Sequence, residues 1–263
     1  MALQYPRMYD HQSTSAQQYQ ALIPYYTTAD CDVSSLQAGV VLGQYHAITG
    51  NNTPVCGNVF AWVKSTEALS KGQLVAWAAP GTDTASTGST TSVLNLVTGG
   101  LTVNAEVGNY VSVLGTTTSE LRVIKANTAS TITVSLPDIY IATQPQDADV
   151  FTTAPSSTNP VSIIRPFRVR VCSGVLQPVG VVLNNVTSGN YTPIQVMGIA
   201  QILTVGSGTA TVVGVPAVPS TSGVIIGSGG TANVYTAGVA IIPQEAYAGS
   251  SRLTTCYINA IGA

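Results

Sequence analysis

Charged residues are scarce in this chain of 263 residues. Only 8% are Asp, Glu, Lys or Arg, against about 25% in an average soluble protein. The spans Val33–Val63 and Val171–Gln244 contain none of them, and the formal net charge is −2 at pH 7. This acidic balance excludes a globally basic nucleic-acid-binding protein, so no direct contact with nucleic acid is expected. Long helical bundles are disfavoured, because exposed helix faces are usually built from Glu, Lys and Arg.

The sequence also lacks a long uninterrupted apolar run, although 45% of its residues are hydrophobic. No stretch reaches the roughly 18 apolar residues that indicate a membrane helix, so no membrane contact is expected. The segment Met1–Arg7 lacks the basic-then-apolar pattern of a secretory signal peptide. We therefore expect synthesis in the cytoplasm of a cell. Disorder is disfavoured, since it requires low hydrophobicity and high net charge.

Cysteine and histidine are too few and too scattered for an ordinary zinc site. The four cysteines, Cys31, Cys56, Cys172 and Cys256, form no CxxC pair and have no neighbouring histidine. Four buried free thiols are the favoured interpretation. A Cys31–Cys56 disulfide is the alternative, which a reducing cytosol disfavours. His46 lies in an apolar stretch that favours a packed imidazole, and we expect neither a metal nor a cofactor.

Catalytic patterns are missing as well. The close acidic pairs are Asp30/Asp32 and Asp147/Asp149, which favour solvated loops, with weak calcium binding as the alternative. There is no GxSxG, no P-loop, and no GxGxxG between a strand and a helix. A glycan-degrading enzyme would need two carboxylates about 5–10 Å apart in a groove, and the sequence shows no candidate pair. We therefore expect a protein that is not an enzyme.

The composition that is present favours β-strands and turns, with 33 Thr, 24 Ser, 25 Gly and 14 Pro. Short runs of β-branched and aromatic residues are separated by turn signals about 8–12 residues apart, which predicts an all-β fold, a short-stranded β-sandwich or β-barrel. The clearest hairpin joins residues 121–125 to 131–136, because both limbs alternate with a period of two. Gly198 breaks the alternation of the 192–205 run, which predicts a β-bulge.

The pattern divides the chain into two β subdomains and an extended N-terminal arm. Residues 1–30 form the arm, 31–80 and 161–263 the core β domain, and 81–160 an inserted β-rich subdomain with flanking loops. The Gly/Thr/Ser-rich composition of segment 80–92 predicts a loop or an excursion of the chain.

Two groups of residues are candidates for partner binding, and the first lies in the arm. It holds five of the 12 tyrosines: Tyr5, Tyr9, Tyr19, Tyr25 and Tyr26. Tyrosine offers a large contact area with a polar tip, which favours a docking arm. A poorly ordered terminus is the alternative.

The second group is a cluster of three arginines within six positions, Arg165, Arg168 and Arg170. On a strand, Arg168 and Arg170 would point to one face, and Phe167, Val169 and Val171 to the other. The cluster predicts docking onto an acidic partner surface or phosphates. A solvent-facing stripe on a half-buried strand is the alternative.

The C-terminal block resembles a known family. A VGVV strand at 179–182 is followed by a polar turn with glycine, the strand 194–202, and a Gly-Val-Ile step at 223–225. This order is similar to that of the small β-barrel or β-sandwich decoration (cement) proteins of tailed-phage capsids. The segments 57–77 and 237–260 fit the flanking strands of the same pattern.

The resemblance implies a non-enzymatic structural virion protein. Proteins of that family bind the major capsid protein on the outer surface of the shell, often as trimers near three-fold positions. They clamp neighbouring capsomers against internal DNA pressure. The expectation for this chain is therefore a homo-oligomer, with a trimer favoured, on the capsid exterior.

Two other non-enzymatic functions stay open. The first is a phage tail, fibre or baseplate protein that binds a host surface glycan through aromatic grooves. Only Trp62 and Trp77 are available for this, and both lie in predicted strands, where packing in the core is expected. The second is a cell-surface or S-layer-like protein, which the missing signal peptide disfavours.

Overall fold

The fold is built almost entirely of β-strands, as the sequence predicts, in a computed structural model of the chain. The structure describes residues 32–34, 45–47, 59–115, 119–135, 150–173, 176–205, 210–227, 240–247 and 251–260. The predicted arm of residues 1–30 lies outside them.

Contacts divide the chain into two compact units. The first, here called the barrel unit, comprises Met1–Ala78 and Phe167–Ala263, and the second, the inserted unit, comprises Ala79–Pro166. The sequence division placed these boundaries at 80/81 and 160/161. The difference arises because the strand at 160–164 pairs within the inserted unit.

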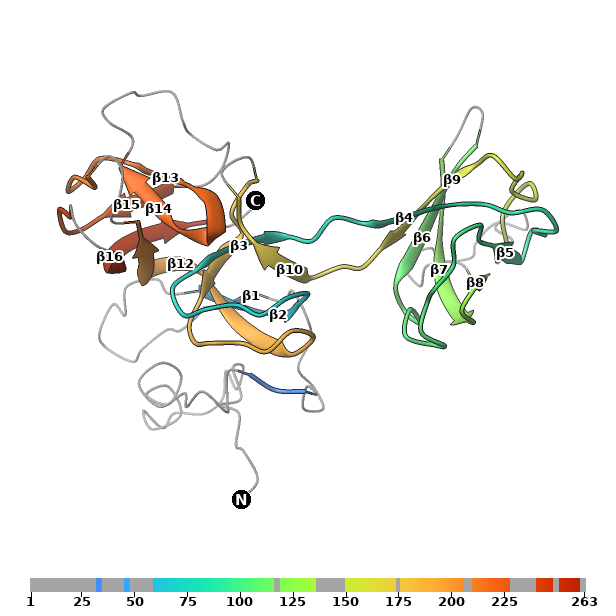
Figure 1. Cartoon of the computed structure of the whole chain (residues 1–263), viewed down its shortest axis with the longest axis horizontal. Helices are drawn as coiled ribbons and strands as arrows, with labels where there is room; N and C mark the ends of the chain where they lie inside the picture. Colours follow the sequence, from blue (N-terminus) through green and yellow to red (C-terminus); the bar gives the residue numbers. More distant parts are fainter. Residues whose placement is uncertain are drawn as a thin grey trace, which may run out of the picture. The chain divides into compact units, whose positions relative to one another are not determined.

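Ten strands belong to the barrel unit (Figure 1). They are β1 (Tyr45–Ala47), β2 (Val59–Ser65), β3 (Leu74–Trp77), β10 (Arg168–Val171), β11 (Gly180–Val182), β12 (Tyr191–Thr204), β13 (Ala217–Pro219), β14 (Ile225–Gly227), β15 (Ala240–Pro243) and β16 (Arg252–Asn259). A turn of 3-10 helix, η1 (Thr221–Gly223), precedes β14.

Five of these strands close into a small barrel. The order is β2-β10-β3-β11-β12, and β12 pairs back onto β2. All pairings are antiparallel except that of β10 with β2. Although β2 and β3 are consecutive strands in the sequence, β10 lies between them. The barrel therefore depends on a strand about 100 residues further along the chain.

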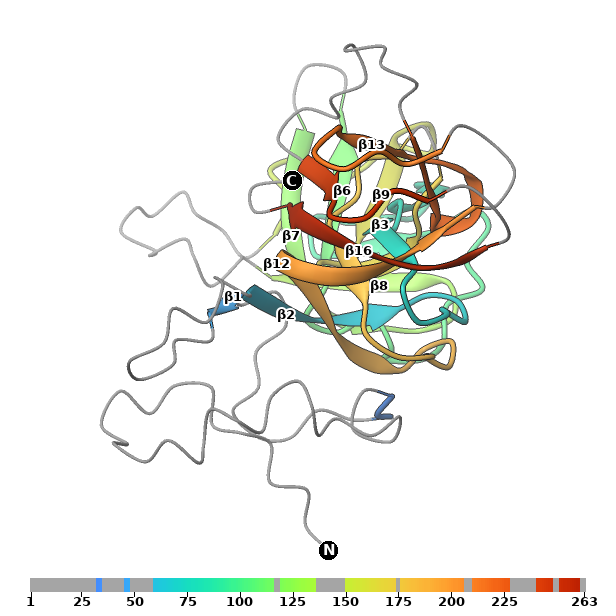
Figure 2. The same cartoon turned by 90° about the vertical axis from the view of Figure 1, so that its left-hand side faces the viewer.

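The long strand β12 joins the barrel to a second layer of strands. Its first half pairs with β2 and β11, and its second half pairs with β16 from Met197 to Thr204 (Figure 2). The register with β2 shifts between Gln195 and Met197, and Gly198 has φ 107. The predicted irregularity at this point is confirmed. β16 then pairs with β15, and β14 with β13.

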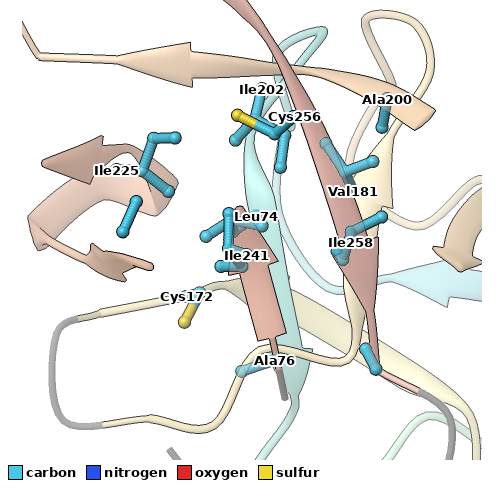
Figure 3. Close-up of a cluster of buried hydrophobic side chains, with 12 residues drawn as sticks. Leu74, Ala76, Cys172, Val181, Ala200, Ile202, Ile225, Ile241, Cys256 and Ile258 are labelled. Carbon is cyan, nitrogen blue, oxygen red and sulfur yellow. The ribbon is translucent and has the colours of Figure 1, made fainter. Parts of the chain in front are cut away.

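The alternation of side chains along β3 and β11 separates two cores in the barrel unit. Val75 and Val182 pack with residues of β2, β10 and β12 inside the barrel. Leu74, Ala76 and Val181 point the other way and pack against β12, β14, β15 and β16 (Figure 3). Both faces of β3 are therefore covered from Leu74 to Ala76, which explains its continuous apolar run.

The inserted unit is a curled six-stranded sheet of order β4-β9-β6-β7-β8-β5. Its strands are β4 (Gly81–Thr84), β5 (Val93–Asn95), β6 (Tyr110–Leu114), β7 (Ser119–Asn127), β8 (Thr131–Ser135) and β9 (Pro160–Ile164). A bridge from Ala85 to Leu96 joins the two edges of the sheet beyond β4 and β5. The curl encloses a core that includes Leu94, Ile124 and Phe151.

Two sequence expectations for the inserted unit have opposite outcomes. The hairpin at 121–136 is confirmed as β7 and β8, with a bulge between Ile124 and Ala126. The expectation of a loop over 80–92 is wrong for its first part, because Gly81–Thr84 forms β4 against β9. Thr82 and Thr84 have the β propensity that the glycine and aspartate around them obscured.

Candidate interaction surface

The structure does not place the predicted partner-binding residues in one cluster. The five tyrosines of the arm lie outside the described residues. Arg165 belongs to the inserted unit, whereas Arg168 and Arg170 belong to the barrel unit. The arginine group is therefore split by the boundary between the units.

Arg165 forms an ion pair with Glu106 of its own unit. Its Nε and Nη2 donate to the two carboxylate oxygens of Glu106, at 2.8 and 2.7 Å. Glu106 also accepts from Asn109 Nδ2 at 2.8 Å, and its own backbone N–H donates to Asn127 Oδ1. Such a bidentate, largely buried pair orients both partners, so it holds the loop before β6 against the end of β9.

Arg168 and Arg170 lie on β10, which is an internal strand of the barrel wall. Arg168 is in register with Lys64 of β2, and Arg170 with Ala76 of β3. Lys64 is in turn opposite Tyr191 of β12, and its Nζ lies 4.9 Å from the centre of the Tyr191 ring. Lys64 and the two arginines thus lie on neighbouring strands. The sequence predicts that Arg168 and Arg170 share a face, but it does not reveal that Lys64 lies beside them.

The alternation predicted for the strand fails at Phe167. Its φ of 59° is in the left-handed region, so the side chain does not follow Val169 into the core. Phe167 is 38% exposed and its ring contacts Trp77 edge to face, with centroids 6.0 Å apart. Trp77 is itself 37% exposed, so the expectation that it packs in the core is wrong. Trp62 is fully buried, as expected.

Each of the six carboxylates in the described part of the chain accepts a hydrogen bond from the fold itself. The donors are Thr187 and Asn190 to Asp32, the Val171 N–H to Glu67, the Thr84, Thr98 and Gly99 N–H groups to Asp83, Asn109 and Arg165 to Glu106, Arg122 and the Thr152 N–H to Glu120, and Arg252 and the Thr255 N–H to Glu245. These carboxylates fix strand ends and loops.

Both described thiols are buried. Cys172 and Cys256 are free and buried in the core between the barrel and the second layer. Burial raises the pKa of Cys172 to about 11 and that of Cys256 to about 12. Cys31 and Cys56 lie outside the described residues. Within the described ranges, no group of three His, Cys, Asp or Glu residues could hold a metal ion.

Comparisons with known proteins give no relative. Scans of protein-family models, of curated proteins and of solved structures each returned no match to this chain. In the part of the chain that the structure describes, no helix has the length and apolar character needed to cross a membrane.

Proposed function

We propose that this chain is a non-enzymatic structural virion protein that decorates the outer surface of a phage capsid. In this proposal it binds the major capsid protein as a homo-oligomer, with a trimer favoured, and clamps neighbouring capsomers. The resemblance of its C-terminal block to capsid cement proteins motivates the proposal. The observation that carries it is that all six described carboxylates are hydrogen-bonded within the fold.

This use of charge suits a surface that other proteins cover. The cores of protein interfaces are depleted in Lys, Glu and Asp. The described carboxylates hold loops and strand ends of the chain itself. Large apolar side chains are left exposed, among them Val103, Ile199 and Val213. Contacts of this kind are individually weak, but many copies on a lattice can be held by avidity.

The proposal is tested by sedimentation and light scattering. Purified protein is mixed with empty shells assembled from the major capsid protein of the same genome, and the pelleted fraction is measured. Saturable co-sedimentation and a concentration-independent trimer mass are expected. A protein that stays monomeric at high concentration and remains in the supernatant would contradict the proposal.

The arm is tested in the same assay. Deletion of residues 1–28 should weaken or abolish the binding to shells if the five tyrosines dock on the partner. Normal decoration by the shortened chain would show that the arm is dispensable.

A glycan-binding tail, fibre or baseplate protein is the second candidate, and the exposure of Trp77 favours it. An exposed indole can stack on a sugar ring. Binding of the purified chain to a glycan array, lost in Trp77→Ala, would support this function. Co-sedimentation with shells in the absence of any glycan signal would contradict it.

A further inference from the structure

Three cations share one stretch of the outer face of the barrel wall. On β10, Val169 packs inside the barrel, so Arg168 and Arg170 leave the opposite face of this strand. On β2, Val63 packs inside the barrel, so its neighbour Lys64 also faces outward. Neighbouring strands lie about 5 Å apart, and alternate residues of one strand about 7 Å apart. The three half-buried side chains therefore start close enough together to reach one small ligand.

The register places two of these cations directly opposite each other. Arg168 of β10 pairs with Lys64 of β2, and like charges on facing residues of neighbouring strands repel each other. The Nζ atom of Lys64 lies 4.9 Å from the centre of the Tyr191 ring, which attracts the ammonium group but does not neutralise its charge. An anion bound beside the two cations would turn this repulsion into attraction.

The side chain of Arg170 gives a second, independent observation. Its Nε atom is buried and donates to no acceptor among the described residues. Buried donors are nearly always hydrogen-bonded, because a donor without an acceptor destabilises the fold. The acceptor that suits a guanidinium N–H best is an anionic oxygen. The buried donor of Arg170 and the facing charges of its neighbours thus indicate the same kind of ligand.

The acids closest to these cations in the strand register are held by the fold itself. Glu67, which follows β2, accepts the Val171 N–H at 2.7 Å. Asp32 accepts three hydrogen bonds from the turn that precedes β12. Within the described ranges, neither carboxylate forms a hydrogen bond or ion pair with Lys64 or Arg170.

We propose that Lys64, Arg168 and Arg170 form a binding site for a phosphate group, either as the free ion or as the monoester of a larger ligand. The three side chains start from the corners of a triangle, which suits a tetrahedral oxyanion that offers a separate oxygen to each. Guanidinium groups match phosphate oxygens in geometry and charge. The inference goes beyond the proposed function and does not depend on it, because all three cations belong to one chain.

The test is a calorimetric titration of the full chain with inorganic phosphate in chloride buffer at constant ionic strength. Saturable binding at one site is expected, and bound phosphate should raise the thermal unfolding midpoint of the wild type. Arg170→Met and Lys64→Met should each weaken binding about 10- to 100-fold, because each removes a charge-assisted contact. Lys71→Met, which removes an exposed lysine of the same unit, should bind as the wild type does.

Thermal unfolding in phosphate-free buffer separates a binding role from a structural one. Arg170→Met should unfold there at the same temperature as the wild type or higher, because it removes a buried donor that lacks an acceptor. The gain in the midpoint on adding phosphate should then appear in the wild type and Lys71→Met and be lost in Arg170→Met. A variant that is destabilised equally in both buffers and keeps the gain would show a purely structural side chain and overturn the proposal.

Phenyl phosphate in a second titration identifies the source of the phosphate group. Binding as tight as that of inorganic phosphate would support a monoester ligand, and binding of inorganic phosphate alone would support the free ion. Phosphate that has no more effect than chloride at equal ionic strength would overturn the proposal, as would unchanged affinity in both Arg170→Met and Lys64→Met. Either failure leaves the proposed function standing, since no shell takes part in these measurements.

Discussion

Asp32 and Asp83 show how single carboxylates tie distant segments of this charge-poor chain together. Partial burial acts to raise the pKa of each carboxyl group, but the hydrogen bonds that each accepts outweigh it, so both pKa values are lowered. Asp83 holds the loop after β5 through the Thr98 and Gly99 N–H groups. A lowered pKa means that the ionised form stabilises the fold.

Replacing Asp32 should reveal how much its ionised carboxylate contributes to the free energy of unfolding. The carboxylate accepts from the Thr187 N–H, the Thr187 hydroxyl and Asn190 Nδ2 at 2.7–2.9 Å, next to the bridge between Val33 and Tyr191. Asp32→Ala should lower the free energy of unfolding at pH 7 by about 1–2 kcal/mol, because hydrogen bonds to a charged group are lost. The measurement is urea unfolding, with Ser34→Ala as the exposed neighbouring control.

The pH dependence of that difference follows from the sign of the shift. The stabilisation by Asp32 is complete above the unfolded pKa of about 3.9 and is lost as pH falls through the lower folded value. The gap between wild type and Asp32→Ala should therefore shrink below about pH 4. A gap that stays constant from pH 7 to pH 3 would contradict the assignment.

The buried thiols predict selective chemical protection. Because burial raises the pKa of Cys172 to about 11 and of Cys256 to about 12, neither forms a reactive thiolate at pH 8. Iodoacetamide should leave both unmodified in the native protein and label both in urea, as read by peptide mass spectrometry. Unfolded thiols ionise near pH 8.5, so the fold should lose stability as pH rises beyond that value. Rapid native labelling of either cysteine would contradict this prediction.

Among the elements, β12 depends on one buried polar side chain at its bend. Gln195 Nε2 donates to the carbonyls of Met197 and Ile199, at 3.2 and 2.9 Å, where the strand passes from the barrel to the second layer. Gln195→Leu keeps the volume and removes the donor, so both carbonyls lose this partner. We expect a loss of about 1–3 kcal/mol in the free energy of unfolding.

The matched control for this prediction lies on the same strand. Gln201→Leu changes an exposed glutamine of β12 in the same way and should have little effect. Urea unfolding followed by tryptophan fluorescence measures both variants, because Trp62 is buried beside this part of β12. Equal effects at positions 195 and 201 would show that the bend does not need the amide.

Local elements of this fold could be predicted from the sequence, whereas pairings between distant strands could not. The β7–β8 hairpin is local, and its alternation is visible within 16 residues, so it was predicted. The insertion of β10 between β2 and β3 is a pairing over about 100 residues that no local pattern reveals. The outward turn of Phe167 depends on its backbone conformation. The aromatic pair was missed for the same reason, because it forms only when β3 and β10 meet.

At the scale of the whole molecule, the two units have separate cores. The barrel unit holds the clusters inside and outside the barrel wall, and the inserted unit holds its own around Leu94 and Ile124. A compact unit with its own core can unfold cooperatively by itself. Calorimetry of the full chain should therefore show two transitions.

The variant Glu106→Gln should show which of the two calorimetric transitions belongs to the inserted unit. The change leaves the largely buried Arg165 guanidinium without its carboxylate, at a cost of about 3 kcal/mol. In a unit of this size that lowers one midpoint by roughly 10–20 °C and leaves the other in place. Glu245→Gln, in the exposed pair with Arg252 of the barrel unit, should leave the inserted unit's transition unchanged. A common shift of both transitions in Glu106→Gln would show instead that the two units unfold as one.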